Sequence, residues 1–411
     1  MARPGVYISK GNGAIGGLLP KEDGVAIMVI SSSLYSATTT DPFYKPVVGY
    51  QLADFEALGI TEATDKTRGE LVWEHLKDFY AEAVNGAELH LMFYPVDVTY
   101  ATLLAAGLTN THIVRLQNYL KEQSGRIKLA IFAQNPSFVE VVWATSPELF
   151  QSLADSEFTK VRPIDILVEG RKMPAISGIA LDMRSYNAPN VSMFWSREKT
   201  RAAALTALAV FSTKVDNYAA IGTYAGRVVS IDVASNPGDA SLGKIKGWSS
   251  VEFSNGTSVA DLSDGSQDSL NTKGFVFATT RPGVVGFWFV DSHTCAAITD
   301  DYAYLERNRV INKAVRLANV SYQKFVLGKV YIDPSTGKIS ADTIGALTGD
   351  MKSVINDNMQ GEVINDGTVV TMDPNQNVLT TGETNTIVEV LPIGINRILK
   401  VKVQFRNPSR V

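Results

Sequence analysis

The chain has 411 residues, a formal net charge of -4 and a sequence pI near 5.7, with 45% hydrophobic and 19% charged residues. This length predicts two domains, and the composition excludes intrinsic disorder. No basic tract, secretory leader or bilayer-length apolar run stands out, which argues against a nucleic-acid binder, a secreted protein and a membrane-spanning protein. The single cysteine, Cys295, excludes an internal disulfide and argues against structural zinc, so we expect folding in a reducing compartment.

The first 24 residues are predicted to form an N-terminal arm. Val6, Tyr7 and Ile8 have strand character. A glycine-rich stretch follows that can neither hold a helix nor pack a core. We interpret it as a flexible tether that contains Gly11, Gly13, Gly16 and Gly17.

Residues 25–271 are predicted to form one α/β domain, because strand patterns alternate there with helical patterns. Between Asn236 and Asn271 the composition shifts to Gly, Ser, Asn and Asp, which indicates loops and a domain boundary. The expected strands are Val25–Ile30, Glu88–Tyr94, Arg126–Ala133, Ile164–Val168 and Ile176–Leu181. The expected helices are Arg68–Val84, His112–Glu122 and Ser196–Phe211.

Residues 272–411 are predicted to form a second domain with two helices and several strands. The helices cover residues 301–327 and Ala341–Asn358. The expected strands are Gly274–Thr279, Gly286–Asp291, Gly361–Met372, Thr386–Leu391 and Arg397–Arg406.

The first of these helices carries two opposite faces. One is apolar, and the other places Arg309, Lys313 and Arg316 in a narrow stripe. A solvated helix face explains such a stripe, and so does a cationic surface that meets an acidic partner. The three residues are therefore candidates for a partner contact.

The last predicted strand has the period-2 pattern of a half-buried strand. Leu399, Val401, Val403 and Phe405 alternate with polar residues. Such a strand either closes its own sheet or pairs with a sheet edge in a neighbouring molecule, and periodicity does not separate these alternatives. The strand-plus-glycine arm at the other terminus favours exchange between molecules.

The region from Arg281 onward resembles the C-terminal domain of contractile phage tail sheath proteins, in the short form shared with contractile injection systems. Five segments carry the resemblance, and the opening Pro4-Gly5-Val6-Tyr7-Ile8 is similar to the start of sheath proteins. They are Asp300-Asp301-Tyr302, Asn308 to Ala314, Val330-Tyr331-Ile332-Asp333 with its Gly337 turn, Gly361-Glu362-Val363, and Leu391-Pro392-Ile393-Gly394.

The resemblance implies a mixed α/β (α+β) fold, in which both chain termini build an inner sheet-and-helix domain and an outer α/β domain is inserted between them. It also implies that neighbouring subunits donate strands to each inner sheet, here Val6–Ser9 and Leu399–Phe405. The glycines near the N-terminus would then serve as a tether, and Arg309, Lys313 and Arg316 as a contact to an inner tube.

In function, the resemblance implies a structural subunit and not an enzyme, with no cofactor and no metal. The expected partners are further copies of the chain in a helical polymer, an inner tail tube protein, and baseplate and tail terminator proteins. Nucleic acid and direct membrane insertion are not expected. The particle would be a virion tail or an injection system assembled in the bacterial cytoplasm. The alternatives are another self-assembling tail or baseplate component, and a soluble α/β enzyme.

Two motifs favour enzymes only superficially. Gly11-x-Gly13-x-x-Gly16 matches a dinucleotide fingerprint, but Gly17 and Pro20 prevent the helix that must begin at its third glycine. Ser196-x-x-Lys199 matches an acyl-enzyme pattern without a later Lys-Thr-Gly, so we expect Ser196 to be a helix N-cap.

Metal sites and a catalytic cysteine find little support either. The loop Asp333 to Asp342 resembles a calcium loop but has Ile344 where the closing glutamate should stand, so a turn is expected. Cys295 has only His293 nearby, and we expect it to be a buried structural residue. The histidines show no metal-ligand spacing, at residues 75, 90, 112 and 293.

Overall fold

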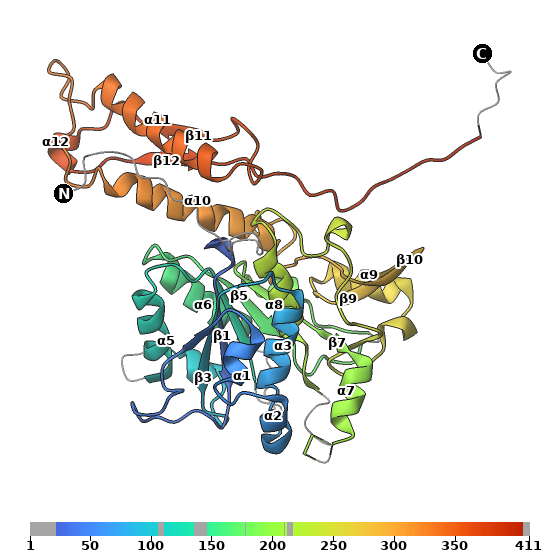
Figure 1. The fold of residues 1–411 in the computed structure, drawn as a ribbon. Helices are drawn as coiled ribbons and strands as arrows, with labels where there is room; N and C mark the ends of the chain where they lie inside the picture. Colours follow the sequence, from blue (N-terminus) through green and yellow to red (C-terminus); the bar gives the residue numbers. More distant parts are fainter. Residues whose placement is uncertain are drawn as a thin grey trace, which may run out of the picture.

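The structure is a computed structural model that describes residues 22–105, 111–134, 146–176, 178–208, 210–211 and 217–405. Its centre is a six-stranded sheet in the order β2-β3-β1-β4-β5-β6 (Figure 1). All strands from β3 to β6 in this order run parallel, and β2 pairs antiparallel with β3 at the edge. The strands are β1 (Ala26–Ser31), β2 (Val47–Gly49), β3 (Leu89–Tyr94), β4 (Leu129–Ala133), β5 (Asp165–Glu169) and β6 (Val191–Phe194).

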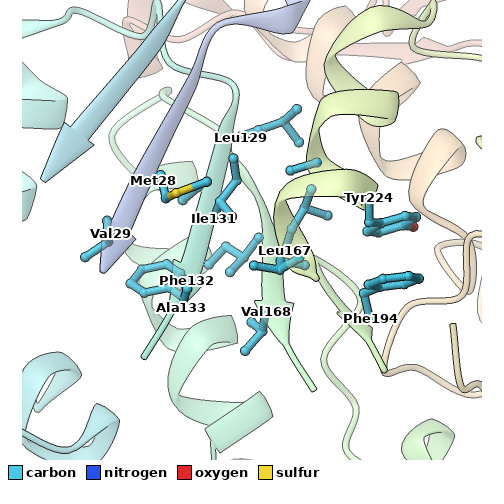
Figure 2. Close-up of a cluster of buried hydrophobic side chains, with 14 of the residues drawn as sticks. Met28, Val29, Leu129, Ile131, Phe132, Ala133, Leu167, Val168, Phe194 and Tyr224 are labelled. Atoms are coloured by element: carbon cyan, nitrogen blue, oxygen red, sulfur yellow. The ribbon is translucent and has the colours of Figure 1, made fainter. Parts of the chain in front are cut away.

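The parallel strands form because their sequences are continuous apolar runs. Every residue of β1, β3, β4, β5 and β6 is buried, which requires cover on both faces of the sheet. Figure 2 shows part of this core, where Phe194 of β6 stacks on Tyr224 with ring centroids 5.4 Å apart. Four of the five strands expected between residues 25 and 181 are confirmed. The expected strand Ile176–Leu181 is not formed by its described residues, which lie in turns and bends.

Helices surround this sheet, with α8 against β4 and β5, and α6 against β5 and β6. The expected helix Arg68–Val84 is formed as α3, which begins only at Val72, because Arg68 is the last residue of α2 and Gly69 adopts the left-handed conformation that ends α2. The helices are α1 (Leu52–Glu56), α2 (Glu62–Arg68), α3 (Val72–Glu82), α4 (Tyr100–Leu104), α5 (Thr111–Glu122), α6 (Ser146–Phe158), α7 (Lys199–Thr206), α8 (Ile221–Ser230) and α9 (Asp264–Thr272).

Helices α3 and α8 pack closely because of two glycines on one face of α8. A Cβ atom on Gly222 would lie 2.1 Å from the His75 carbonyl oxygen, and one on Gly226 would lie 2.2 Å from the Phe79 carbonyl oxygen. Since the two glycines are four residues apart, they face α3 together. No larger side chain fits at either position without moving a helix.

Two small sheets extend the α/β region beyond the central sheet. β7 (Ser196–Glu198) pairs with β8 (Val251–Phe253), and β9 (Ala278–Arg281) pairs with β10 (Val284–Phe289). The expected helix Ser196–Phe211 is therefore wrong at its start. Its first residues form β7, and Glu198 caps α7 by accepting from the Arg201 backbone N–H.

The main hydrophobic core runs from Val25 to Leu305, so the expected boundary at residue 271 is wrong. The segment from Asn236 to Asn271 contributes Ile245, Phe253 and Leu270 to this core. Its polar composition reflects turns between short buried pieces, not a linker. We call residues 22–305 the α/β body and the remainder of the described chain the C-terminal unit.

The C-terminal unit contains two long helices and one hairpin sheet, and it extends over one end of the body (Figure 1). Helix α11 matches its expected bounds, whereas α10 is shorter than expected. The two strands β11 and β12 are also shorter than the expected strands Gly361–Met372 and Thr386–Leu391. A second core joins this unit to Val233 and Ala234 of the body. The elements are α10 (Leu305–Gln323), α11 (Ala341–Asn358), β11 (Val369–Met372), α12 (Val378–Thr381) and β12 (Thr386–Glu389).

Candidate functional site: the C-terminal arm and its surroundings

The C-terminal arm, residues 398–405, is extended and leaves the rest of the molecule (Figure 1). No hydrogen bond joins it to the other described residues, so the expected final strand has no sheet partner within the described chain. Its apolar row is open to solvent, with exposed fractions of 76% for Leu399, 72% for Val401, 90% for Val403 and 106% for Phe405. Burying each side chain would contribute about 1.5–3 kcal/mol, so the arm has a strong tendency to find a partner.

Arg397 marks the point where the arm leaves the molecule. Its Nε donates to Oδ2 of Asp291 over 2.8 Å, and its Nη2 pairs with Oε1 of Glu306. The guanidinium carbon lies 3.4 Å from the ring centroid of Tyr304, which places a cation on the face of an aromatic ring. Asp291 follows β10 and Tyr304 precedes α10, so Arg397 attaches the C-terminal segment to the junction of the body and α10.

The two carboxylates under Arg397 are buried. Burial would raise the pKa of Asp291, but the positive charges and hydrogen bonds around it, including those of Arg397, outweigh burial and lower the pKa. For Glu306 the burial dominates, and its pKa is raised although Arg397 and the Ser292 hydroxyl favour the charged form. Removing Arg397 would therefore leave two buried acids without their cation.

The sheet of the C-terminal unit has two open edges in the described chain. β11 and β12 pair antiparallel from Val369 opposite Glu389 to Met372 opposite Thr386, with no third strand among the described residues. One face packs on the core of the unit, whereas Val369 and Ile387 are exposed. An exposed two-stranded sheet is only marginally stable alone, and its edges are templates for further strands.

An apolar groove of about 650 Å³ lies beside this sheet. It is formed where α10 ends, along α11 and near α12. Leu327 and Tyr331 are exposed at its rim. Among its lining residues are Tyr322, Phe325, Val326, Leu347, Met372 and Val378.

The cationic stripe on α10 faces inward, so the expectation of a solvent-facing stripe is wrong. Arg309 donates to the carbonyls of Ile231 and Asp232, both over 3.3 Å, at the C-terminal end of α8. These carbonyls lie at and just beyond the C-terminus of α8, where the helix dipole makes a buried guanidinium favourable. Arg309 is thus bound inside the molecule and does not form a free contact surface for a tube.

Lys313 and Arg316 hold the two units together. The Lys313 Nζ lies 2.8 Å from Asp23 of the body and 2.7 Å from Glu362 of the C-terminal unit. Arg316 pairs with Asp23 over 3.5 Å and donates to the Pro163 carbonyl. All three cations therefore serve the junction, and we do not assign the tube contact to them.

Asp165 adds a buried acid to the same junction. Its Oδ1 accepts from Asn312 over 3.0 Å and from Asn190 over 3.2 Å. Burial raises its pKa to about 6, against the lowering effect of these hydrogen bonds and of Arg309 and Arg316. The face of α10 that looks polar in sequence is thus a second buried face.

The predicted strand and tether of the N-terminal arm lie outside the described residues. These are the strand residues Val6, Tyr7 and Ile8 and the tether glycines Gly11, Gly13, Gly16 and Gly17, of which the first three form the dinucleotide-like pattern.

The residues weighed for enzyme chemistry have structural surroundings. Ser196 is not an N-cap, since its hydroxyl accepts from the Ala278 backbone N–H within β7. Asp333 caps a turn by accepting from the backbone of Ser335 and Thr336, which confirms the expected turn. No group of His, Cys, Asp and Glu suited to a metal ion occurs among the described residues.

Cys295 is buried, as expected, and burial raises the pKa of its thiol to about 12. His293 is also buried, and burial lowers its pKa to about 4, so its ring is neutral at pH 7. Its Nε2 lies 2.6 Å from Asn271 Oδ1 and its Nδ1 lies 3.0 Å from Arg184 Nη2, so both ring nitrogens contact groups other than the Cys295 thiol.

Sequence reasoning missed Arg397 and its partners. Asp291 and Glu306 lie 106 and 91 residues before Arg397 in the chain, and a lone arginine between Asn396 and Ile398 carries no pattern. No helix among the described residues is long and apolar enough to cross a bilayer.

The sequence matches the family described as DUF2586, with its N-terminal domain over residues 3–293 and its C-terminal domain over residues 301–410. The chain belongs to the DUF2586 family. The division between the two family domains falls near residue 300, close to the boundary that the hydrophobic cores define. A search of curated protein sequences found no match for this DUF2586 protein.

Solved structures resemble this DUF2586 chain along its full length. A chain of the anti-feeding prophage baseplate is 13% identical with a TM-score of 0.62, and the match covers 99% of both chains. A chain of the PVC sheath complex, an extracellular contractile injection system in its contracted state, is 12% identical with a TM-score of 0.60 over 98% of both. The sheath tail protein of Desulfitobacterium hafniense is 9% identical with a TM-score of 0.50, over 95% of this chain and 100% of that one.

These matches confirm the mixed α/β fold and the resemblance to contractile sheath proteins at the level of fold. At such low identity, what those proteins assemble into is a statement about them alone.

Proposed function

We propose that this DUF2586 protein is the structural sheath subunit of a contractile tail or injection particle, which polymerises around an inner tube and contracts to drive that tube through an envelope. The single observation that carries the proposal is the exposed C-terminal arm. A row of four large apolar side chains is mostly exposed on an extended segment without a sheet partner in the described chain. The full-length likeness to a chain of a sheath complex supports this assignment.

The acceptor of the arm is the β11–β12 sheet of a second copy. The arm is long enough for this contact. Its eight residues, 398–405, span about 26 Å when extended at about 3.3 Å each, which is longer than either four-residue strand of the hairpin. Main-chain hydrogen bonds would supply affinity, and the alternating side chains would select one face. A head-to-tail contact of this kind builds a closed ring when its rotation closes and a helical polymer when it does not, and a sheath subunit requires the second case.

Contraction would follow from two features of such a lattice. Strand links keep the subunits joined while the bodies rotate, and a shorter lattice that buries more surface is favoured at about 25 cal/mol per Å² of apolar area. The other partners would be the inner tube, a baseplate and a terminator protein. Assembly in the bacterial cytoplasm belongs to the same proposal, as do the N-terminal donated strand at Val6–Ser9 and its glycine tether.

Electron microscopy of the purified chain in negative stain tests this function. The full chain is compared with a chain that ends at Ile398, which loses the apolar row but keeps Arg397. Long hollow tubes from the full chain, and only monomers from the shortened chain, are the expected result. Monomers from both chains would overturn the proposal.

A baseplate component is the second candidate, because the matched chain with the highest TM-score given above comes from a baseplate. The same experiment separates the two functions, since a baseplate component would form closed rings of fixed copy number in place of long tubes.

A further inference from the structure

The chain is attached twice in the few residues before the arm begins. The first attachment is to the C-terminal unit, where the Ile364 N–H donates to the Leu391 carbonyl over 2.9 Å and Ile393 donates to Glu362 over 3.4 Å. The second attachment is Arg397, which binds the α/β body through Asp291 and the start of α10 through Glu306. Beyond Ile398 the described chain makes no further hydrogen bond.

The position of these attachments decides where a force on the arm would go. β12 ends at Glu389, only eight residues before Arg397. Tension that reached β12 would pull on one end of a four-residue ladder and break its pairs one after another. The backbone bonds at residues 391–393 add only about 0.5–1.5 kcal/mol each against such a pull.

Arg397 is better suited to bear this force. It makes charge-assisted bonds to two carboxylates whose side chains are at most 9% exposed, and its planar group lies on the Tyr304 ring. A guanidinium reaches two acids and stacks at the same time, which an ammonium does not do. Its partners also lie in the body, at Asp291 and Tyr304, and at the start of α10, at Glu306, and not in the hairpin.

We propose that Arg397 is the positioning residue of the C-terminal arm, which fixes the point where the arm leaves the donor and passes load on the arm to the α/β body instead of to β12. This inference rests on the proposed function, because load arises only when a neighbour takes the arm. The hairpin that receives a neighbour's strand is thereby separated mechanically from the arm that its own chain donates.

Arg307 provides a matched control. It carries the same charge, lies on the same helix as Glu306 and also approaches the Tyr304 ring, at 5.2 Å. It is exposed, and its one hydrogen bond goes to the Asp301 carbonyl. R307Q therefore removes a neighbouring cation that shares the Tyr304 ring but leaves the bonds of Arg397 to Asp291 and Glu306 in place.

The anchor is tested by distance measurement between two spin labels within one chain. Labels are placed at Lys400→Cys on the arm and Asp268→Cys on α9, both exposed positions, while buried Cys295 does not react. Labelled chains are diluted with an excess of unlabelled chains, so that only distances within a chain are seen. A narrow distribution is expected for the wild type and for R307Q. R397Q should broaden it to at least about twice that width, as for a flexible segment.

A distance distribution for R397Q as narrow as that of the wild type would overturn the inference. A wild-type distribution as broad as that of R397Q would overturn it as well. Because R397Q leaves two buried acids unpaired, the double variant R397Q/E306Q is measured as well. It removes one of these charges, so its thermal unfolding temperature should be closer to that of the wild type. Its distance distribution should be as broad as that of R397Q.

Hydrogen exchange of the amides at Ile387 and Val388 tests the load path in assembled particles. Exchange in β12 should rise in R397Q and not in R307Q, and in unassembled chains neither variant should change it. Equal exchange in assembled R397Q and wild type would contradict the load path. Failure of the proposed function is recognised separately, because no particles would form while the label distances still report on the anchor.

Discussion

The α/β body and the C-terminal unit meet their bonding requirements in different ways. In the body, each parallel strand is buried along its full length, and buried charges such as Arg227 and Glu82 are paired. In the C-terminal unit, a two-stranded sheet, an apolar groove and an extended arm remain open. Under the proposed function, the body supplies the stability of the single chain, whereas the C-terminal unit supplies association between chains. The predictions below test this contrast on the free energy of unfolding of the isolated chain.

The largest effect is expected at the contact between α3 and α8. G222V should destabilise the chain by about 3 kcal/mol, because the new side chain meets the His75 carbonyl at a distance that no side chain tolerates. Urea unfolding followed by circular dichroism measures the change. G265A on α9 is the control, since nothing lies within 4 Å of its Cβ position, and it should change stability by less than about 1 kcal/mol. A loss in G265A equal to that in G222V would contradict the packing explanation.

A smaller effect is expected at the junction of the two units. R309Q should cost about 2–3 kcal/mol, because the carbonyls of Ile231 and Asp232 lose a buried cationic donor. R307Q, two residues away on the exposed side of the same helix, should stay within about 0.5 kcal/mol. Equal urea midpoints for the two variants would show that the stripe is a solvated face after all.

Asp165 predicts a pH dependence at the same junction. Its folded pKa of about 6 lies above the ordinary value of 3.8, so the folded state binds more protons in that range. The contribution of Asp165 to stability is therefore fully present below about pH 4 and is lost as the pH rises through 6. D165N should flatten this decline, by about 2–3 kcal/mol at pH 7, in thermal unfolding scans from pH 4 to pH 8. An unchanged slope would place the pH dependence elsewhere.

The smallest effect on the isolated chain is expected in the arm. V403S should change the free energy of unfolding by less than about 0.5 kcal/mol, because Val403 is exposed. Its effect should appear only on association, where losing a buried valine raises the critical concentration for assembly by about tenfold or more. Light scattering measures this concentration, and Q404S on the other face of the arm is the control. A V403S chain that assembles like Q404S would remove the apolar row from the contact.

Sequence reasoning was most successful where one short-range pattern decides the structure. β1, β3, β4 and β5 are apolar runs between polar turns, and the long helix α11 has a serine cap and a regular period. The region from Asn236 to Asn271 was interpreted as loops because its buried pieces are only three to nine residues long and lie between turn residues. Tertiary context, not local pattern, decides such short elements.

The remaining errors concern contacts between distant residues. Amphipathicity assigns one buried face to α10, but this helix lies between two packed units and therefore buries its cationic face as well. The apolar row of the arm was found in the sequence because alternation is a local signal. The Arg397 anchor was not, because its acids come from residues far away in the chain.

Photochemical cross-linking tests the central claim most directly, namely that the arm of one copy joins the β11–β12 sheet of another. A benzophenone amino acid replaces Val403, and isotopically heavy and light chains are mixed before assembly. The account predicts that cross-linked peptides pair a heavy arm with a light segment from residues 363–390, and the reverse. Cross-links confined to chains of one isotope, or directed to the α/β body, would contradict it.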